Sequence, residues 1–309
     1  MKKLVSIVIP CYNSSESIEE LVDELMVIEK KNNYNFEIIL VNDCSKDNTI
    51  EKIKNLSNKY SSVIGIDLMF NVGQFRAVMC GFENSNGDYV ITMDDDLQHP
   101  PSEVPKLIDA IENDENIDAV FARPIKREHK TYRNLGSAFA GFISRKIFKK
   151  PKNFTMSAFR ILRREVVDSV VAHRTMFPVI GPIIVKSTSK IINIDVLHKP
   201  RKYGISNYRL LKLIRMTFDN VINFSSFPLK VISSIGIIAF GVSVILILFY
   251  LIRYLIGGIG VAGWTTNVIL INLYGGLILS SIGVIGEYLI RIMYEVNGFP
   301  KYKIRKKYK

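Results

Sequence analysis

The sequence predicts an α/β fold, a mostly parallel β-sheet with helices on both faces, followed by an amphipathic helix and two membrane-spanning helices. Three observations carry this prediction. Short apolar, β-branched runs alternate with helical segments up to about residue 122, which is the pattern of a parallel sheet covered by helices. Polar clusters follow these runs, at the strand ends where such sheets bind ligands. Uncharged apolar stretches then occupy residues 231–252 and 264–286.

Each strand is expected where an apolar, β-branched run ends at turn residues. Strands are expected at 4–9, 36–41, 63–68, 89–93, 119–122 and 190–197. Helices are expected at 16–30, from the polar turn 42–47 to about 59, at 73–83, from Pro100 onward, and near 133–148 and 164–172. The polar run 14–17 offers N-cap candidates for the first helix.

The carboxyl-terminal third predicts attachment to a membrane. Residues 208–224 place apolar side chains on one helical face and basic ones on another, as in a helix that lies in the membrane interface. The stretches 231–252 and 264–286 are each long enough to cross a hydrocarbon core of about 30 Å. Their outer flanks are rich in Lys and Arg, so the positive-inside rule predicts a multi-pass protein of the inner (plasma) membrane with its amino-terminal domain in the cytosol. Small residues within 275–286 permit close helix packing and a homo-oligomer.

The formal charge of +12 over 309 residues is unevenly distributed. Acidic residues lie mainly in the first 120 positions, and basic ones gather in 123–215 and in the tail 301–309. This distribution favours membrane lipids with anionic headgroups and a phosphorylated substrate as partners. There is no zinc-finger spacing or RNP-type motif, so we expect no nucleic-acid partner. The three cysteines form no CxxC pair and are expected to be reduced thiols.

Three consecutive carboxylates, Asp94, Asp95 and Asp96, directly follow the predicted strand 89–93, and Gln98 lies two residues further. Carboxylates crowded at a strand end repel one another unless a cation or solvent relieves them. Asp94, Asp96 and Gln98 offer the oxygen ligands of a hard divalent ion such as Mg²⁺ or Mn²⁺. Such an ion would stabilise the charge on a departing diphosphate. An isolated pair of this spacing is more often an acidic surface loop, and the preceding strand favours the metal site.

Four segments, together with the two apolar stretches, resemble the family-two glycosyltransferases and, within them, the polyprenyl-phosphate glycosyltransferases. The segments are SIVIPCYN (6–13), VNDCSKDNT (41–49), NVGQFRAVMCGF (71–82) and GDYVITMDDDLQHPP (87–101). The resemblance implies a GT-A-like (Rossmann-like) fold. It also implies metal-dependent, inverting transfer of a sugar from a nucleotide-sugar donor to a polyprenyl phosphate, for cell-envelope glycan or glycolipid modification. A UDP-linked donor and an undecaprenyl carrier are expected.

The resemblance further implies roles for individual residues. Nucleotide-sugar binding is assigned to Pro10, Tyr12, Asn13, Asp43, Gln74, Asp94 and Arg123. Contact with the acceptor phosphate is assigned to Arg127, Arg201, Ser206 and Tyr208. The metal is assigned to Asp94, Asp96 and Gln98, and the catalytic step to Asp94, Asp96 and Arg201. For Asp43, a turn-forming role is the alternative.

Two positions depart from the family pattern. Asn207 stands in RKYGISNY where a lysine is usual, and Ala158 stands in NFTMSAFR where some relatives carry an acidic residue. A sugar hydroxyl would need a general base as it attacks, but a lipid monophosphate, with a second pKa of about 6, is already mostly dianionic at neutral pH. The site then has to align two anions and screen their repulsion. The alternatives are a catalytically impaired, membrane-tethered nucleotide-sugar-binding protein and a transferase with a different acceptor.

The predicted organisation has four parts. Residues 1–200 form the cytosolic GT-A-like catalytic domain, 201–228 the interfacial helix region, 229–292 the two-helix transmembrane region, and 293–309 a basic cytosolic tail.

Overall fold

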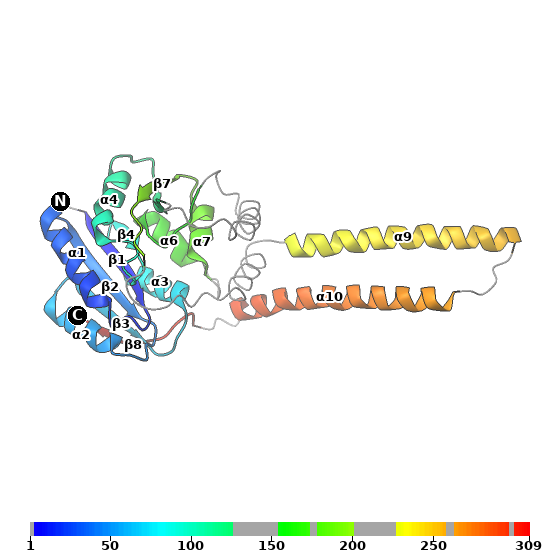
Figure 1. The fold of residues 1–309 in the computed structure, drawn as a ribbon, viewed down its shortest axis with the longest axis horizontal. Coiled ribbons are helices and arrows are strands. Elements are labelled where there is room, and N and C mark those ends of the chain that lie inside the picture. The colour runs from blue at the N-terminus through cyan, green and yellow to red at the C-terminus, as the bar shows by residue number, and fades with distance from the viewer. Residues whose placement is uncertain (1–2, 126–153, 174–177, 201–226, 258–262, 297–299) are drawn as a thin grey trace. The chain divides into compact units, whose positions relative to one another are not determined.

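The computed structural model describes residues 3–125, 154–173, 178–200, 227–257, 263–296 and 300–309. The chain divides into two compact units. One comprises Met1–Arg209 together with Phe299–Lys309, and the other comprises Leu210–Gly298. The first unit contains a mixed α/β sheet, and the second contains two long helices (Figure 1).

The sheet of the first unit has eight strands in the order β7-β5-β6-β4-β1-β2-β3-β8. The strands are β1 (Leu4–Cys11), β2 (Asn35–Asn42), β3 (Val63–Leu68), β4 (Tyr89–Thr92), β5 (Ala119–Pro124), β6 (Arg160–Arg163), β7 (Ile191–Val196) and β8 (Ile304–Tyr308). Strands β6 and β8 pair antiparallel with their neighbours, whereas β1–β2, β2–β3, β1–β4 and β5–β7 pair parallel. Four of the seven strand pairings are parallel and three are antiparallel. The expected α/β fold is confirmed, and its sheet is mixed, with β4-β1-β2-β3 as the parallel part.

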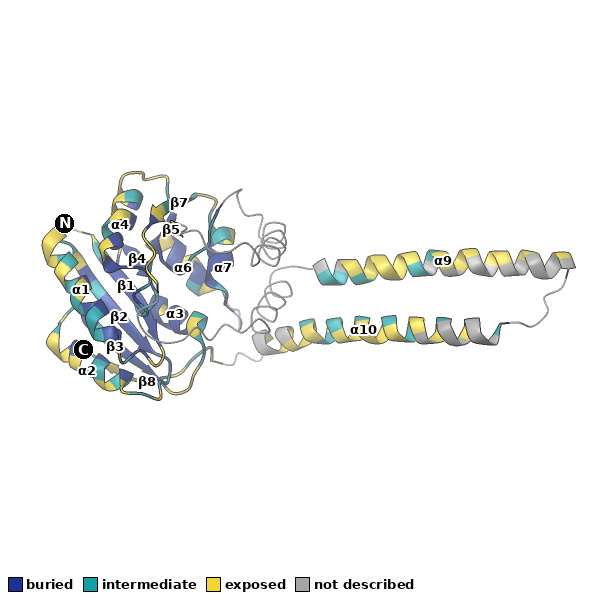
Figure 2. Ribbon diagram, viewed as in Figure 1, coloured by how far each residue is buried: buried dark blue, intermediate teal, exposed yellow. Residues whose placement is uncertain are grey.

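Helices cover both faces of this sheet (Figures 1 and 2). They are α1 (Ile18–Asn32), α2 (Thr49–Lys59), α3 (Gln74–Glu83), the 3₁₀ turn η1 (Pro101–Glu103), α4 (Val104–Glu112), α6 (Arg164–Ala172) and α7 (Ile180–Ser187). The main core lies between one face of the sheet and the helices α1, α2 and α4. Side chains such as Ile7, Leu21 and Ile108 are buried there. Burial of each such side chain stabilises the fold by about 1.5–3 kcal/mol.

Most expected elements are present with shifts of one or two residues. The first helix begins at Ile18, and its N-cap residue Ser17 makes no side-chain capping hydrogen bond, so the capping expectation is wrong. Strand β1 continues through Pro10 instead of ending there. Elements β6, α7 and β8 were not expected from the sequence. The expected helices at 133–148 and 208–224 lie outside the described residues.

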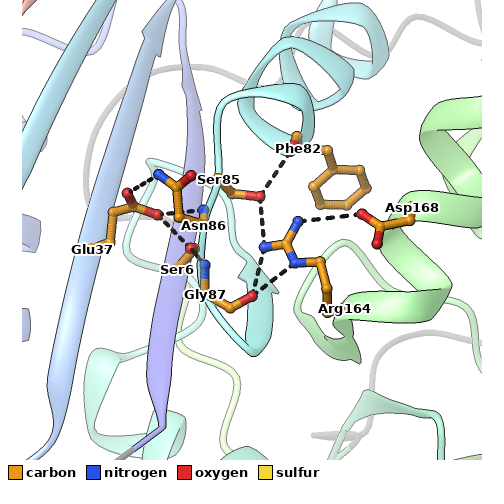
Figure 3. A network of polar contacts seen from close by, with 8 residues as sticks. All are labelled: Ser6, Glu37, Phe82, Ser85, Asn86, Gly87, Arg164 and Asp168. Atoms are coloured by element: carbon orange, nitrogen blue, oxygen red, sulfur yellow. Dashed lines mark hydrogen bonds and ion pairs between the residues drawn. The ribbon is translucent and has the colours of Figure 1, made fainter.

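A polar network fixes the turn that leads into β4, at the amino end of that strand (Figure 3). The guanidinium of Arg164 donates to the carbonyl oxygen of Gly87 from Nε (2.9 Å) and Nη2 (2.6 Å), and also to Ser85 Oγ (3.2 Å). On the other side, Gly87 N donates to Ser6 Oγ at 2.8 Å. A Cβ at Gly87 would lie 2.5 Å from the backbone nitrogen of Ser6, so glycine is required there. This network anchors β4, whose opposite end carries Asp94–Asp96.

The second unit contains α9 (Phe227–Gly257) and α10 (Trp264–Val296), which contact each other. Among the described residues, one 18-residue window, Leu273–Ile290, is long and apolar enough to span a membrane. This is a criterion of length and composition only. The prediction of two transmembrane helices is thus supported for one helix, and the second stays a prediction.

Candidate functional site

The polar clusters seen in the sequence meet at one edge of the sheet. Strands β4, β1, β2 and β3 are adjacent and parallel, so their carboxyl ends share that edge. The turn 12–15 follows β1, the turn 43–48 follows β2, the loop 69–73 follows β3, and the acidic loop 93–100 follows β4. Pro10 lies within β1 and is buried, and the Tyr12 side chain is exposed at the edge.

Asp43 holds the loop that follows β3. Its carboxylate accepts hydrogen bonds from the backbone amides of Val72 (Oδ1, 2.6 Å) and Gly73 (Oδ2, 2.9 Å). Its backbone carbonyl accepts a further bond from Asn71 Nδ2 at 3.0 Å. Burial raises the pKa of the Asp43 carboxyl, while the two amides and Arg76 act in the opposite direction. Both carboxylate oxygens of Asp43 therefore hold the loop after β3 in place. This contact reaches further than a role confined to the turn 43–48.

The turns after β1 and β2 are cross-linked through Asn13. Asn13 N donates to Ser45 Oγ at 3.0 Å, and Asn13 Oδ1 accepts from Lys46 N at 2.9 Å. Asn13 and Cys44 both have a φ of 56°, a left-handed conformation uncommon for residues other than glycine. Residues held in such conformations cluster at functional sites. Asn13 therefore connects the turn after β1 to the turn after β2.

The three consecutive aspartates point to different partners. Asp95 Oδ2 accepts a hydrogen bond from Ser14 Oγ and a longer one from Tyr12 N at 3.4 Å. Burial raises the pKa of Asp95. As whole residues, Asp94, Asp95 and Asp96 are all partly exposed, and they differ in their hydrogen-bond partners. Asp95 therefore ties the acidic loop to the turn after β1 and leaves its two neighbours at the edge.

Asp94 and Asp96 have separate contacts within the site. Asp94 Oδ1 accepts from Gln74 Nε2 at 2.6 Å, which joins the end of β4 to the start of α3. Asp96 Oδ1 accepts from the backbone amide of Gln98 at 3.0 Å, and the intervening Leu97 has a φ of 58°. Six residues predicted from the sequence thus lie at this edge of the sheet, on the loops that follow the strands and at the start of α3: Asn13, Asp43, Gln74, Asp94, Asp96 and Gln98.

The residues present fit a divalent cation that is shared with a ligand. Among the described residues, no group of three or more His, Cys, Asp and Glu side chains is arranged to hold a metal. Asp94 and Asp96 supply two carboxylates and Gln98 an amide, all oxygen donors. Mg²⁺ is commonly bound by one or two carboxylates plus substrate phosphates and water, without a complete protein cage. The donor set accordingly fits a cation that arrives with a diphosphate.

A second group of residues lies beside the acidic loop. Lys199 N donates to the carbonyl oxygen of Gln98 at 2.8 Å, which attaches the segment after β7 to this loop. The His99 ring is buried and stacks 5.1 Å from Phe159 and 4.9 Å from His198, centroid to centroid. Burial and His198 lower the pKa of His99 to about 4, so the ring is neutral at physiological pH.

On the other face of β4, Arg160 is buried, and its Nε donates to Thr92 Oγ1 at 3.0 Å. Thr92 Oγ1 in turn donates to the carbonyl oxygen of Ala158 at 2.5 Å. Burial lowers the pKa of Arg160 to about 10, and the negative charge of Asp94 opposes that shift. The backbone of Ala158 thereby takes part in the contact between β4 and the segment that precedes β6.

Other predicted site residues stand apart or lie outside the described ranges. Arg123 forms a two-point ion pair with Asp195, from Nε to Oδ1 at 2.5 Å and from Nη2 to Oδ2 at 3.0 Å. Its guanidinium already has a carboxylate partner, and its assignment to the donor stays a prediction. The residues assigned to the acceptor phosphate, Arg127, Arg201, Ser206 and Tyr208, lie outside the described residues, as does Asn207.

Sequence reasoning missed Ser14, Asp95 and Arg160. Ser14 was taken as an N-cap candidate, because a serine before a helix usually has that role. For Asp95, no pattern within the irregular loop 93–100 marks its contact with Ser14, which lies 81 positions earlier in the chain. For Arg160 no local signal exists, because its partner Thr92 is 68 residues away.

Comparison with known proteins gives consistent results. The sequence model of the family described as "Glycosyl transferase family 2" matches residues 6–171. The chain is 32% identical to an undecaprenyl-phosphate 4-deoxy-4-formamido-L-arabinose transferase of Proteus mirabilis, over 98% of this chain and 93% of that protein. It is equally similar, at 32% identity, to the protein of the same name from Photorhabdus laumondii, with 98% and 94% covered.

Solved structures share the fold. Glucosyl-3-phosphoglycerate synthase from Mycobacterium tuberculosis, crystallised with Mn²⁺, uridine diphosphate and glucosyl-3-phosphoglycerate, superposes with a TM-score of 0.54 at 17% identity, covering 71% of this chain and 78% of that one. Mannosyl-3-phosphoglycerate synthase from Rubrobacter xylanophilus gives a TM-score of 0.52 at 15% identity, with 71% and 72% covered. At these identities the likeness establishes the architecture of the sheet and helices.

Proposed function

The chain belongs to glycosyl transferase family 2, and we propose that it transfers a sugar from a nucleotide-sugar to a polyprenyl phosphate at the cytosolic face of a membrane. The bacterial relatives are named as undecaprenyl-phosphate transferases, which supports undecaprenyl phosphate as the acceptor. The 4-deoxy-4-formamido-L-arabinose of their names is the first sugar to test. A UDP-linked donor is proposed, in keeping with the uridine diphosphate bound by the solved structure of the same fold.

One observation carries the proposal: Gln74 and Asp94 are in contact at the sheet edge where Asp43, Asn13 and Asp96 also lie. The turns around Asn13 and Asp43, joined by hydrogen bonds, are proposed to receive the nucleoside. Asp94 and Asp96 lie at the end of the neighbouring strand, where the diphosphate of such a donor would reach. The turns proposed for the nucleoside follow β2 and β1, and the carboxylates follow β4, which is the strand next to β1 in the sheet.

The proposed divalent cation, Mg²⁺ or Mn²⁺, would be held by Asp94, Asp96 and Gln98. When bound, it supplies charge stabilisation for the diphosphate that leaves the sugar. Mn²⁺ in the solved neighbour supports this choice of metal class. The task of the protein is to keep both carboxylates in place, and the contacts of Asp94 with Gln74 and of Asp96 with Gln98 N serve that task.

The acceptor explains why no side-chain base is required. A lipid phosphate is already an anionic nucleophile at neutral pH, so its oxygen attacks the anomeric carbon without loss of a proton. We propose a single displacement with inversion, with Arg201 and the neighbouring Ser206 and Tyr208 holding the acceptor phosphate. Ala158 in place of an acid is compatible with this chemistry. Positioning and charge screening then provide the rate enhancement.

The membrane arrangement completes the proposal. Helices α9 and α10 are proposed as two spans, with residues 1–200 and the carboxyl-terminal tail on the cytosolic side and residues 201–228 as the interfacial region. A polyprenyl phosphate has its anionic head at the membrane surface. An anchored catalytic domain is therefore close to its acceptor without having to extract the lipid.

The test is a product assay with the purified full chain in lipid. Undecaprenyl phosphate and Mn²⁺ are offered with a panel of UDP-sugars, including UDP-4-deoxy-4-formamido-L-arabinose, and lipid-linked sugar is measured by mass spectrometry. We expect one donor to give product, with loss of product when the cation is chelated or Asp96 is changed to Asn. Donor binding without lipid product from any sugar would favour a nucleotide-sugar-binding protein and refute the proposed transfer.

A further inference from the structure

The carboxyl-terminal strand β8 reaches the loop that Asp43 holds. It forms the edge of the sheet, antiparallel to β3. At its start, Met69 N donates to the carbonyl oxygen of Lys303 at 2.8 Å, and Arg305 Nη2 donates to the carbonyl oxygen of Met69 at 3.3 Å. Both backbone polar groups of Met69 are therefore bound by the last ten residues of the chain. Met69 is the first residue of the loop that supplies the Val72 and Gly73 amides.

A second series of contacts runs from Arg305 through two buried residues, Asp67 and Asn42, to the turns after β2 and β1. Arg305 Nη1 lies 3.6 Å from Oδ2 of Asp67, a buried carboxylate on β3. Asp67 Oδ1 accepts from Asn42 Nδ2 at 2.7 Å. Asn42 Oδ1 then accepts from Ser45 N at 3.2 Å, and Ser45 Oγ accepts from Asn13 N. Every link is a hydrogen bond or ion pair, and the series ends at Asn13, in the turn after β1 that is proposed to receive the nucleoside.

The approach to β8 is also attached to the first unit. The hydroxyl of Tyr302 donates to the carboxylate of Glu83 at the end of α3, and Lys301 Nζ donates to the carbonyl oxygen of His173 at 3.0 Å. The sequence suggested a basic tail for lipid headgroups. The structure gives two basic side chains of this tail, Lys301 and Arg305, specific partners on the first unit, and the role of the tail toward lipid stays a prediction.

We propose that strand β8 is a positioning element of the donor site, in which Arg305 acts through Asp67 and Met69 to hold the turn 42–45 and the loop 69–73 in the conformation that receives the nucleotide. This inference rests on the proposed function only for the identity of the ligand. The carboxyl terminus thereby takes part in a site built otherwise from the first hundred residues. Arg305 touches no substrate in this account and is a positioning residue.

Local and global effects of Arg305 can be separated. The Arg305 side chain is 57% exposed, and ion pairs with an exposed partner contribute little to overall stability. Its removal leaves the buried Asp67 carboxylate with Asn42 as its remaining partner among the contacts described above. We therefore expect the loss of Arg305 to make local opening of the loop 69–73 and the turn 42–45 more frequent, because local opening is governed by local contacts.

The test compares Arg305→Met with Lys307→Met, which removes the same charge from an exposed position of the same strand. Hydrogen exchange of the Val72 and Gly73 amides and the dissociation constant of UDP with Mn²⁺ are measured on the full chain in lipid. For Arg305→Met we expect loop exchange to rise and UDP binding to weaken, each by roughly fivefold or more. Exchange in β1 and β4 should be unchanged. Lys307→Met should resemble the wild type, and Arg305→Lys should recover part of the protection.

Each remaining outcome has a defined meaning. Unchanged loop exchange and UDP affinity in Arg305→Met would overturn the inference. An equal rise of exchange in β1, β4 and the loop would overturn it too, because Arg305 would then be a general stabiliser. If the wild type binds no uridine nucleotide, the proposed function fails, while the exchange data still decide whether β8 positions the loop.

Discussion

Gln74 Nε2 donates a hydrogen bond of 2.6 Å to Oδ1 of Asp94. Gln74 is the first residue of α3, and Asp94 lies two residues beyond the end of β4. Gly73, immediately before Gln74, has a φ of 84° and donates its amide to Asp43. One short segment, 72–74, therefore connects Asp43, which follows β2, to Asp94 in the acidic loop.

Changing Gln74 to Ala should lower the transfer rate more than it lowers stability. The substitution removes the donor that orients Asp94, and a misplaced catalytic group costs on the order of tenfold to a hundredfold in rate. We expect kcat to fall by about that factor, with a change in the free energy of unfolding of about 1 kcal/mol or less. Steady-state kinetics and chemical denaturation of the same preparations make the comparison. Wild-type kcat in this variant would mean that the Gln74 contact has no part in the reaction.

Changing Asp43 to Asn should weaken donor binding. The carboxylate accepts from two backbone amides, and an amide side chain offers one acceptor oxygen and places an NH₂ group against the other amide. An unsatisfied polar pair of this kind costs about 1–3 kcal/mol, so the loop 69–73 should open. UDP affinity, measured by calorimetry with Mn²⁺, should fall by at least about tenfold. Retained affinity would show that this loop is not part of the nucleotide site.

The three cysteines should react very differently with alkylating reagents. Burial raises the pKa of Cys80 to about 12 and that of Cys11 well above its usual value, and thiols react as thiolates. The raised pKa keeps both thiols protonated at neutral pH, so neither should be labelled in the native protein. Cys44 is partly exposed beside Asp43 and should be labelled first. Peptide mass spectrometry after iodoacetamide treatment reads all three sites.

Bound nucleotide should protect Cys44. UDP with Mn²⁺ would cover the turn after β2, and the labelling rate of Cys44 should fall in proportion to occupancy of the site. ADP at equal concentration serves as the control for non-specific effects. Cys44 labelling that is indifferent to a saturating uridine nucleotide would argue against a nucleoside at this turn.

Changing Arg164 to Met should destabilise the fold without altering the chemistry. The substitution removes the donors to Gly87 O and Ser85 Oγ shown in Figure 3. Loss of a partly buried charged donor that leaves its acceptors unpaired costs about 2–3 kcal/mol. Denaturant unfolding should show this loss, while KM for the donor should stay near the wild-type value under folding conditions. A large KM effect would indicate that the amino end of β4 influences the site.

Local sequence patterns could predict the strands that are continuous apolar runs and the helices that are long or amphipathic. Strands β1 to β4 are short, continuous apolar runs, and their ends place Asp43, Asp94 and Asp96 correctly at one edge. Strands β6 and β8, with the sequences RILR and IRKKY, show neither a run nor a clear alternation. They are strands because of the neighbours with which they pair, and strand preference depends strongly on such context.

The same limit applies to the site. The residues proposed for the metal, Asp94, Asp96 and Gln98, lie within five positions of one another, and Asn13 and Asp43 belong to short motifs that directly follow predicted strands. Each could therefore be proposed from the sequence alone. The contacts of Asp95 with Ser14, of Arg123 with Asp195 and of Arg305 with Asp67 join residues far apart in the chain. No spacing rule identifies such pairs, because only the strand order of the sheet brings them together.

The most direct test of the account is a structure of the full chain determined with Mn²⁺ and UDP. We predict the cation at Asp94 and Asp96, the diphosphate beside it, and the uridine against the turns that contain Asn13 and Asp43. The structure also has a cavity at the amino ends of the strands, lined in part by Lys3, Glu112 and Arg163. Nucleotide bound in that cavity, with the 94–98 loop in contact with neither metal nor phosphate, would contradict the account.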